Sequence, residues 1–182
     1  MSADWAAWRA ALQGKEDSAT RLVRQLTPQA MGLARQLLRR HEDAEDVVQE
    51  SFLRLWGAQP SETRGAALAT YFNTIVINRC KTWLVKRHEL STDPEQLAEW
   101  IDAAPPADHT ADTASDALDA PRLRAAMLQL PARQRMALAM WAYADADVAQ
   151  IARSLELDTN AAHQLLHRAK ATLRRSLQEN PP

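Results

Sequence analysis

The sequence predicts an all-α protein in which an acidic flexible linker joins two small helical domains. Residues that favour helices, such as alanine, leucine, arginine and glutamine, abound, whereas only four glycines occur among 182 residues. β-branched residues are sparse, and the alternating patterns and Asn-Gly turns that indicate strands are missing. A hydrophobic content of 46% is enough to form a buried core.

Helical periodicity predicts five helices before the linker and four after it. The first five are expected at residues 3–13, 16–25, 28–39, 43–56 and 66–87. Pro28 suits the first turn of the third helix, and Pro60 lies in a loop after the fourth. The last four are expected at residues 119–129, 132–143, 147–154 and 159–176. Asp147 with Gln150 fits a capping box, and Asp158 can cap the last helix.

The net charge of −1 hides an uneven distribution along the chain. Residues 1–89 carry a net charge of +3, residues 90–120 of −8 and residues 121–182 of +4. The acidic stretch has no sustained apolar period, so it cannot bury enough surface to offset the entropy lost on ordering. We therefore expect a linker at 90–118 between a domain at 1–89 and a domain at 119–178.

Composition excludes several classes of protein. No apolar run is long enough to cross a bilayer, and the N-terminus lacks the pattern of a signal peptide. Cys80 is the single cysteine, which excludes an internal disulfide framework, and we expect it to be a buried structural thiol. No glycine-rich phosphate loop, metal-ligand cluster or catalytic triad is evident. The sequence therefore predicts a cytoplasmic protein that is not an enzyme, has no cofactor or metal, and makes no membrane contact of its own.

An unusual polar face occurs in the stretch DAEDVVQESFLRLW, residues 43–56. On a helix, Asp46, Gln49 and Glu50 share one patch of surface because they are spaced at i, i+3 and i+4. A solvated helix face usually mixes acids with lysines at i+4, and this face does not. The acidic patch therefore indicates a function.

The helix TYFNTIVINRCKTWLVKRHE interleaves aromatic and basic side chains. This combination suits single-stranded nucleic acid, because rings stack on exposed bases while cations follow the backbone. The alternative is that the aromatic residues belong to the core and the cations are merely solvated. For Ile75 and Leu84 the core interpretation is preferred.

The stretch DVAQIARSLELDTNAAHQLLHRAKATLRRSL has the layout of a helix-turn-helix, although a plain helical hairpin fits the same spacing. The inward faces are formed by Val148, Ile151, Ala152 and Leu155 of the first helix and by Ala162, Leu165, Leu166 and Ala169 of the second. The end of the second helix carries three cations, Lys170, Arg174 and Arg175. There they interact favourably with the helix dipole and can bind DNA phosphates.

The polar residues early in the second helix have two interpretations. Asn160 and Gln164 can pair bidentately with adenine in the major groove, or they can belong to a solvated face. His163 and His167 form an i, i+4 pair that could in principle bind a metal ion. Since no third ligand is evident, the metal interpretation is disfavoured.

Taken together, these features resemble the extracytoplasmic-function sigma factors, the compact two-domain class of bacterial RNA polymerase specificity subunits. The resemblance covers nearly the whole chain. It rests on DAEDVVQESFLRLW, YFNTIVINRCKTWLV, LPARQRMALAM and VAQIARSLEL…LLHRAK. In this family the Asp-x-x-Gln-Glu face docks on a basic coiled-coil of the largest polymerase subunit, so Asp46, Gln49 and Glu50 would be the core contacts. Clustered carboxylates on a rigid helix suit charge-assisted pairs with arginines.

The resemblance also implies two contacts with promoter DNA. The helix 71–87 and the loop QPSETRGAAL before it would melt and read the minus-ten element, with a flipped base near Asn78. The residues expected to contact this element are Tyr71, Phe72, Asn78, Lys81, Lys86 and Arg87. The residues expected to read the minus-thirty-five element as duplex DNA are Asn160, His163, Gln164, His167, Arg168, Lys170 and Arg174. Most relatives are held inactive by an anti-sigma factor wedged between the two DNA-binding domains, so such a partner is expected here.

The second helix departs from the family pattern Gly-Thr-Val-Lys-Ser-Arg at residues 160–165. Two cations of that pattern are replaced by His163 and Leu165, which removes phosphate contacts. Glu156 stands where a turn glycine is usual, which strains the turn if its φ is positive. Tyr71 replaces the usual tryptophan. These departures leave open a sigma-like decoy that binds an anti-sigma factor without directing transcription, although a decoy would not need the acidic docking face.

Overall fold

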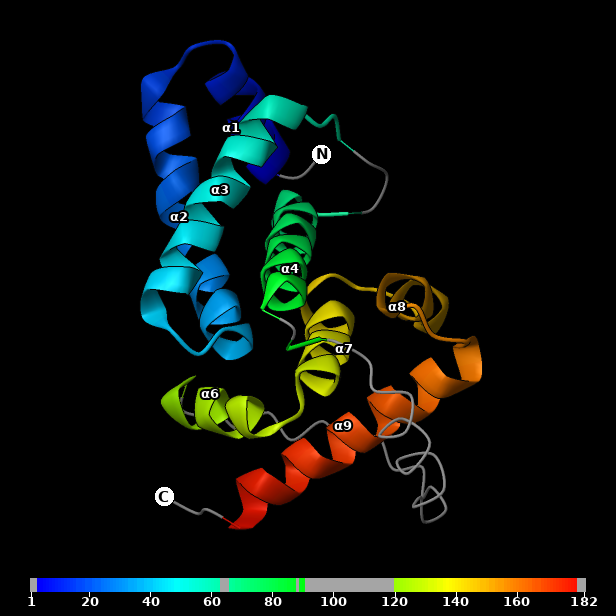
Figure 1. The fold of residues 1–182 in the computed structure, drawn as a ribbon. Helices are drawn as coiled ribbons and strands as arrows, with labels where there is room; N and C mark the ends of the chain where they lie inside the picture. Colours follow the sequence, from blue (N-terminus) through cyan, green and yellow to red (C-terminus); the bar gives the residue numbers. More distant parts are fainter. Residues whose placement is uncertain (1–2, 63–65, 88, 91–119, 180–182) are drawn as a thin grey trace.

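The computed structural model describes residues 3–62, 66–87, 89–90 and 120–179, and all regular elements in these residues are α-helices (Figure 1). The first group contains α1 (Ala3–Leu12), α2 (Glu16–Leu37), α3 (His41–Ala58) and α4 (Leu68–Lys86). The second group contains α6 (Ala120–Gln129), α7 (Ala132–Tyr143), α8 (Val148–Leu155) and α9 (Thr159–Glu179). The prediction of an all-α protein is confirmed. The expected linker at 90–118 lies outside the described residues, apart from Leu90.

The prediction of separate helices at 16–25 and 28–39 was wrong, because Pro28 lies inside one continuous helix, α2. Proline removes one backbone donor from a helix. The apolar residues on both sides of Pro28 nevertheless lie in phase on a single buried face, formed by Leu22, Leu26, Ala30, Leu33 and Leu37. Burial of this shared face stabilises one continuous helix despite the proline within it.

Helix α3 is longer than predicted, since it runs from His41 to Ala58 rather than from 43 to 56. It ends at Gln59, which adopts a left-handed conformation with φ 42° and donates its backbone N–H to the carbonyl of Leu55 at 3.1 Å.

Two tryptophans of α1, Trp5 and Trp8, are at most 1% exposed and lie beside the loop between α3 and α4. The indole N–H of Trp5 donates to the carbonyl oxygen of Ala66 at 2.9 Å, and that of Trp8 donates to the carbonyl oxygen of Pro60 at 2.9 Å. Trp8 also packs edge-on against Trp56, with 5.2 Å between ring centroids. These contacts fix both ends of the loop between α3 and α4.

In the second group, α8 and α9 cross closely at a helix-turn-helix. Ala152 and Ala162, which are 3% and 0% exposed, form part of the buried contact between the two helices. The predicted capping box is present, since the Asp147 carboxylate accepts from the N–H of Gln150 while the Gln150 side chain accepts from the N–H of Asp147. Asp158 caps α9 by accepting from the N–H of Ala161 at 2.8 Å.

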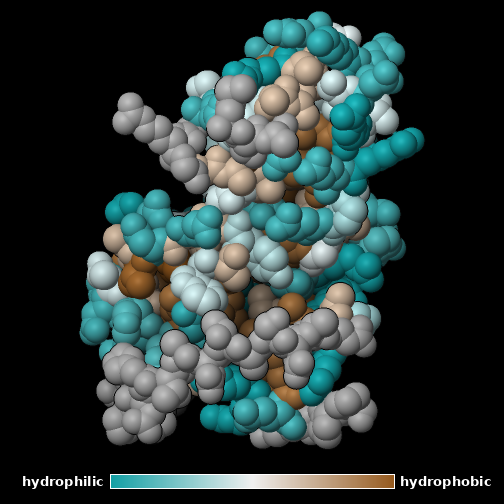
Figure 2. All heavy atoms as spheres, turned by 180° about the vertical axis from the view of Figure 1, so that it is seen from behind, coloured by the Kyte–Doolittle hydropathy of each residue, from teal (hydrophilic) through white to brown (hydrophobic). Residues whose placement is uncertain are grey.

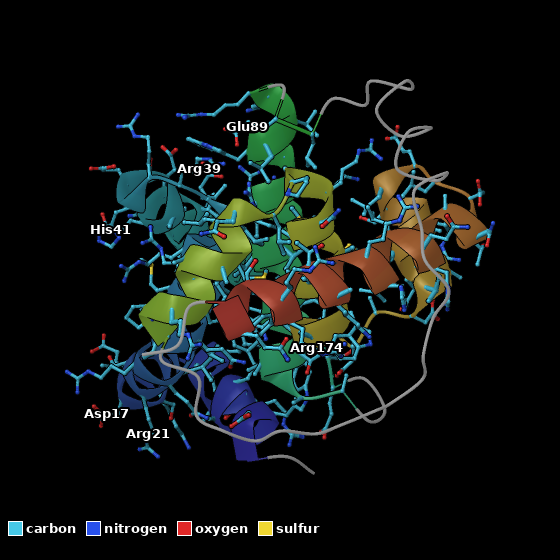
Figure 3. All side chains as sticks on the ribbon, turned by 90° about the horizontal axis from the view of Figure 1, so that it is seen from below. Asp17, Arg21, Arg39, His41, Glu89 and Arg174 are labelled. Carbon is cyan, nitrogen blue, oxygen red and sulfur yellow. The ribbon has the colours of Figure 1, made fainter. Side chains whose placement is uncertain are left out.

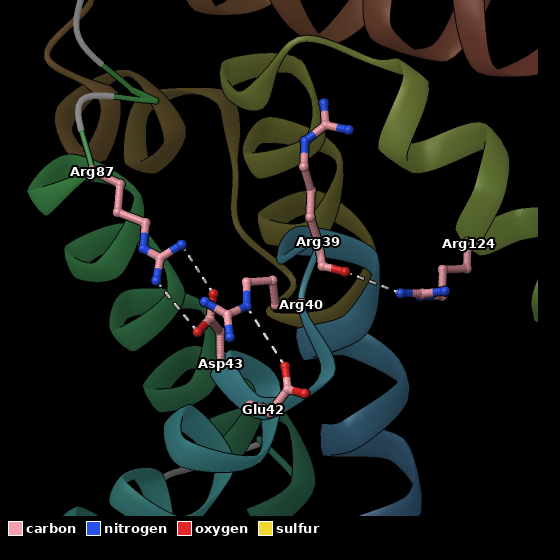
Figure 4. Close-up of polar contacts among 6 residues, drawn as sticks. All are labelled: Arg39, Arg40, Glu42, Asp43, Arg87 and Arg124. Atoms are coloured by element: carbon pink, nitrogen blue, oxygen red, sulfur yellow. Dashed lines mark hydrogen bonds and ion pairs between the residues drawn. The ribbon is translucent and has the colours of Figure 1, made fainter.

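The two groups of helices pack directly against each other, with α6 against α2 and α7 against α2 and α4 (Figure 1). Tyr143, at the end of α7, exchanges hydrogen bonds with the side chain of Gln36 at 3.0 and 3.2 Å. Its backbone carbonyl accepts from the side chain of Asn73 at 3.0 Å. Arg124 of α6 donates to the carbonyl oxygens of Arg35 and Arg39 near the end of α2, and Figure 4 draws the Arg39 contact.

Among the coloured residues of the rear face, hydrophilic ones predominate, with smaller hydrophobic areas between them (Figure 2). Polar side chains such as Asp17, Arg21 and His41 point outward from the helices (Figure 3). In the part of the chain that the structure describes, no helix combines the length and apolar character needed to span a bilayer. The exposed large hydrophobic residues of that part are Leu12, Val23, Leu53, Val85 and Trp141.

Candidate functional site

The acidic face predicted at residues 46–50 lies on the outer side of α3. Val47, Val48 and Ser51 point into the core, and they leave Asp46 and Gln49 exposed. α3 is held on its inner side by contacts with both α2 and α4. The structure therefore presents Asp46 and Gln49 on a rigid support, as a docking surface requires.

Glu50 differs from its two neighbours because its carboxylate forms an ion pair with Arg79 of α4. The Arg79 side chain is 17% exposed and that of Glu50 is 45% exposed. Sequence reasoning missed this pair, since the two residues lie on different helices 29 positions apart. The charge of Glu50 is thus partly neutralised within the chain, and the carboxylate free on this face is that of Asp46.

A second ion pair joins α3 to the end of α4. Asp43 is buried, at 7% exposure, and its carboxylate lies 3.3 Å from one guanidinium nitrogen of Arg87 and 3.5 Å from another (Figure 4). Arg87, which was expected to contact the minus-ten element, therefore serves as the partner of a buried acid in this structure. The sequence did not predict this pairing, because an aspartate at position 43 does not indicate which distant residue it will contact.

Of the α4 residues predicted to contact DNA, some are exposed and others are buried or already paired within the chain. Asn78 and Lys86 are exposed, and Tyr71 is half-buried. Phe72 is 1% exposed and packs on Phe52 with ring centroids 4.5 Å apart, so the expectation that it contacts DNA does not fit this structure. It occupies an inward position of the helix, where the aromatic ring fills the core.

Lys81 of α4 contacts the second group of helices. Its ammonium group donates to the backbone carbonyl of Ser154 in α8. A residue expected at the minus-ten element therefore lies against the helix-turn-helix. Sequence reasoning missed this contact because it depends on how the two groups pack.

On α9, the residues expected to read duplex DNA are unequally accessible. Asn160, His163, His167 and Arg174 are exposed, whereas Gln164 and Arg168 are half-buried. The ammonium of Lys170 lies 3.4 Å from the ring centroid of Trp141, in a cation–π contact. Burial, followed by repulsion from Arg174, lowers the pKa of Lys170. Lys170 is therefore engaged by Trp141, whereas Arg174 and Arg175 beside it are exposed.

A cavity of about 820 Å³ lies between the end of α7 and the middle of α9. His163 and His167 line it together with Trp141 and Lys170. Within the described residues, no group of three histidine, cysteine, aspartate or glutamate side chains is placed to hold a metal ion. The cavity wall combines aromatic, cationic and imidazole groups with the carboxylates of Asp145 and Asp147.

Cys80 lies on the inward face of α4 and is buried, at 0% exposure. Burial raises the pKa of its thiol to about 12. A protonated, inaccessible thiol is a poor redox centre, which fits the predicted structural role.

Two family profiles match the chain. Sigma-70 region 2 matches residues 22–89, and Sigma-70 region 4 matches residues 121–173. The chain is 30% identical to the ECF RNA polymerase sigma factor SigM of Mycobacterium tuberculosis, over 80% of this chain and 69% of SigM. It is also 30% identical to the ECF RNA polymerase sigma factor SigG of the same organism, over 72% of this chain. The chain spans about two fifths of SigG, since the match covers 41% of that protein.

The fold is similar to a solved structure, the sigma factor RpoE in complex with the anti-sigma factor NepR from Bartonella quintana. The TM-score is 0.55 with 20% sequence identity, and the match covers 89% of this chain and 98% of that one. At this identity the similarity concerns the arrangement of helices.

Proposed function

The chain belongs to the ECF sigma factors of RNA polymerase, and from that premise we propose that it binds polymerase core and directs promoter-specific initiation of transcription. The observation that carries the proposal is the order of the two matched regions on one chain, each with an accessible polar surface. Sigma factors act in transcription, and no catalytic role is proposed for any residue of this chain. Because RNA polymerase is a cytoplasmic enzyme in bacteria, we place the protein in the cytoplasm.

The surface proposed for polymerase core is the outer face of α3. Asp46 and Gln49 are exposed there and can pair with arginines of a basic coiled-coil. Glu50 contributes less in this proposal, because Arg79 already satisfies its carboxylate. The domain from 1 to 89 would carry this function.

The surface proposed for the minus-ten element is the accessible part of α4 and the loop before it. Asn78 and Lys86 offer an amide and a cation, and the half-buried Tyr71 offers an aromatic ring for stacking. Trp5 and Trp8 support this arrangement, since they hold the loop by both ends. Lys81 and Arg87 could contact the DNA only after Lys81 releases the carbonyl of Ser154 and Arg87 releases the carboxylate of Asp43.

The surface proposed for the minus-thirty-five element is the N-terminal half of α9. Asn160, His163 and His167 are exposed, and Arg174 extends the surface towards phosphates. With few free cations, this contact would be weak in duplex DNA alone and would depend on attachment to polymerase. The domain from 119 to 178 would carry this function.

An anti-sigma factor is the proposed regulator. The solved relative RpoE is in complex with the anti-sigma factor NepR, which supports a similar partner here. Because the two groups of helices pack on each other and Lys81 donates to Ser154 within this chain, a partner wedged between the two groups would have to replace these contacts with its own.

The proposal is tested by transcription in vitro with sigma-free bacterial core polymerase on fragmented DNA from the source organism. We expect discrete start sites that share two upstream motifs, and loss of these transcripts with Asp46→Ala combined with Glu50→Ala. The matched control is Glu16→Ala combined with Asp17→Ala, which removes two exposed acids from α2. Core binding without transcripts would favour the decoy, and no core binding would overturn the proposal.

A further inference from the structure

One large hydrophobic side chain lies on the acidic face of α3. Leu53 is 70% exposed, the highest value among the exposed large hydrophobic residues that the structure describes, the next being Val85 at 52%. Leu53 follows Asp46 by seven positions, Gln49 by four and Glu50 by three, so all four share one stripe of the helix. A single exposed leucine is common on protein surfaces. Its position within a docking face is what requires an explanation.

The polar groups that are free to pair lie at only one end of this stripe. Arg79 holds Glu50, which leaves Asp46 and Gln49 as the polar groups free to pair on the stripe. Leu53 continues the stripe beyond Gln49, away from the acidic first turn of α3 that contains Glu42 and Asp43. The face therefore changes along the helix from acidic to apolar.

This order fits a partner surface that is basic at one end and apolar at the other. Exposed charges mainly steer encounter and set orientation, whereas apolar side chains buried at the centre of an interface slow dissociation. Interfaces also gain much of their affinity from a few well-buried anchors. On this stripe, Asp46 is the carboxylate that can steer the encounter, and Leu53 is the apolar side chain that can slow dissociation.

We propose that Leu53 is the apolar anchor of the polymerase-binding face and packs against an apolar side chain beside the basic groups that pair with Asp46. The inference rests on the proposed function and deepens it, because it divides the face into a steering carboxylate and an anchoring leucine. The occupant is a basic helical surface of polymerase core. Glu50 is a positioning residue held by Arg79 and is not the main contact.

The test measures binding of the full-length protein to immobilised core polymerase, with association and dissociation rates recorded at several salt concentrations. Leu53→Ala is expected to weaken affinity about tenfold, mainly through faster dissociation. Leu53→Asp is expected to weaken it further, and Leu53→Met to stay within about threefold of the unmodified protein. Asp46→Asn is expected to slow association and to reduce its salt dependence.

Leu12→Ala is the matched control, since Leu12 is an exposed leucine on α1, outside this face. It should leave core affinity unchanged. Thermal unfolding of each variant shows whether the fold is intact, and Leu53→Ala should melt within a few degrees of the unmodified protein because the residue is mostly exposed. If Asp46→Asn weakens binding while Leu53→Ala and Leu53→Asp bind normally, the anchor is refuted and the docking face stands. If the unmodified protein does not bind core, both proposals fall.

Discussion

The hydroxyl of Tyr143 holds the two groups of helices together through Gln36, so its removal has a calculable effect. Tyr143→Phe deletes the oxygen that both donates to and accepts from the Gln36 amide, at 3.2 and 3.0 Å. Gln36 is only 8% exposed, which limits replacement of these bonds by water. The backbone contact from Asn73 to the carbonyl of residue 143 remains in the variant.

The magnitude follows from the burial of the two partners. A buried polar group left without a hydrogen bond costs about 1–3 kcal/mol. Tyr143 is half-buried, so some water reaches the site and the lower part of that range applies. We expect Tyr143→Phe to lower the free energy of unfolding by roughly 1–1.5 kcal/mol.

The assay is urea denaturation followed by circular dichroism, with Tyr71→Phe as the control. Tyr71 is the other tyrosine of the sequence, is also half-buried, and its hydroxyl forms no hydrogen bond within the described residues. The control should stay within about 0.5 kcal/mol of the unmodified protein. Adding Gln36→Leu should recover most of the loss, because both polar partners are then gone. Equal midpoints for Tyr143→Phe and Tyr71→Phe would refute the reasoning.

Three further predictions concern stability. Arg87→Ala leaves the buried Asp43 carboxylate unpaired, and we expect it to lower the free energy of unfolding in urea by about 1–2 kcal/mol. This is less than for a fully buried pair, because the Arg87 side chain is 41% exposed. A loss below about 0.3 kcal/mol would contradict this prediction. Glu156→Gly relieves a left-handed backbone with φ 56° and is expected to stabilise by about 0.5–1 kcal/mol in calorimetry, whereas a lower melting temperature would show that no strain was present. Burial raises the pKa of Cys80 from 9.0 to about 12, so the unfolded chain loses this proton first. Stability should then fall by up to about 1.4 kcal/mol per pH unit above pH 9, and Cys80→Ala should lessen that slope.

The all-α class and most of the helices followed from the sequence because they depend on local periodicity. The caps at Asp147 and Asp158 were predictable for the same reason, since a cap involves residues three positions apart. Pro28 was misread because a local rule about proline was applied where a long buried face determined the outcome. The in-phase apolar residues on both sides of Pro28 were visible in the sequence and would have corrected it.

The candidate site was less predictable where a residue's role depends on another helix. Asp46 and Gln49 were found correctly as surface residues, because their exposure follows from the period of α3 alone. The pairing of Glu50 with Arg79, and the contact of Lys81 with Ser154, depend on how helices distant in sequence pack. Phe72 illustrates the same limit, since aromatic residues suit both a base-stacking surface and a core.

The two indole contacts of α1 bear on how fragments of this protein should be made. The match to Sigma-70 region 2 begins at residue 22, after α1 has ended. A fragment cut at that boundary would retain the whole matched region yet lose Trp5 and Trp8, which hold the carbonyls of Ala66 and Pro60. It would also remove the edge-on contact of Trp8 with Trp56. A fragment intended for binding studies should therefore begin no later than Ala3, where α1 starts.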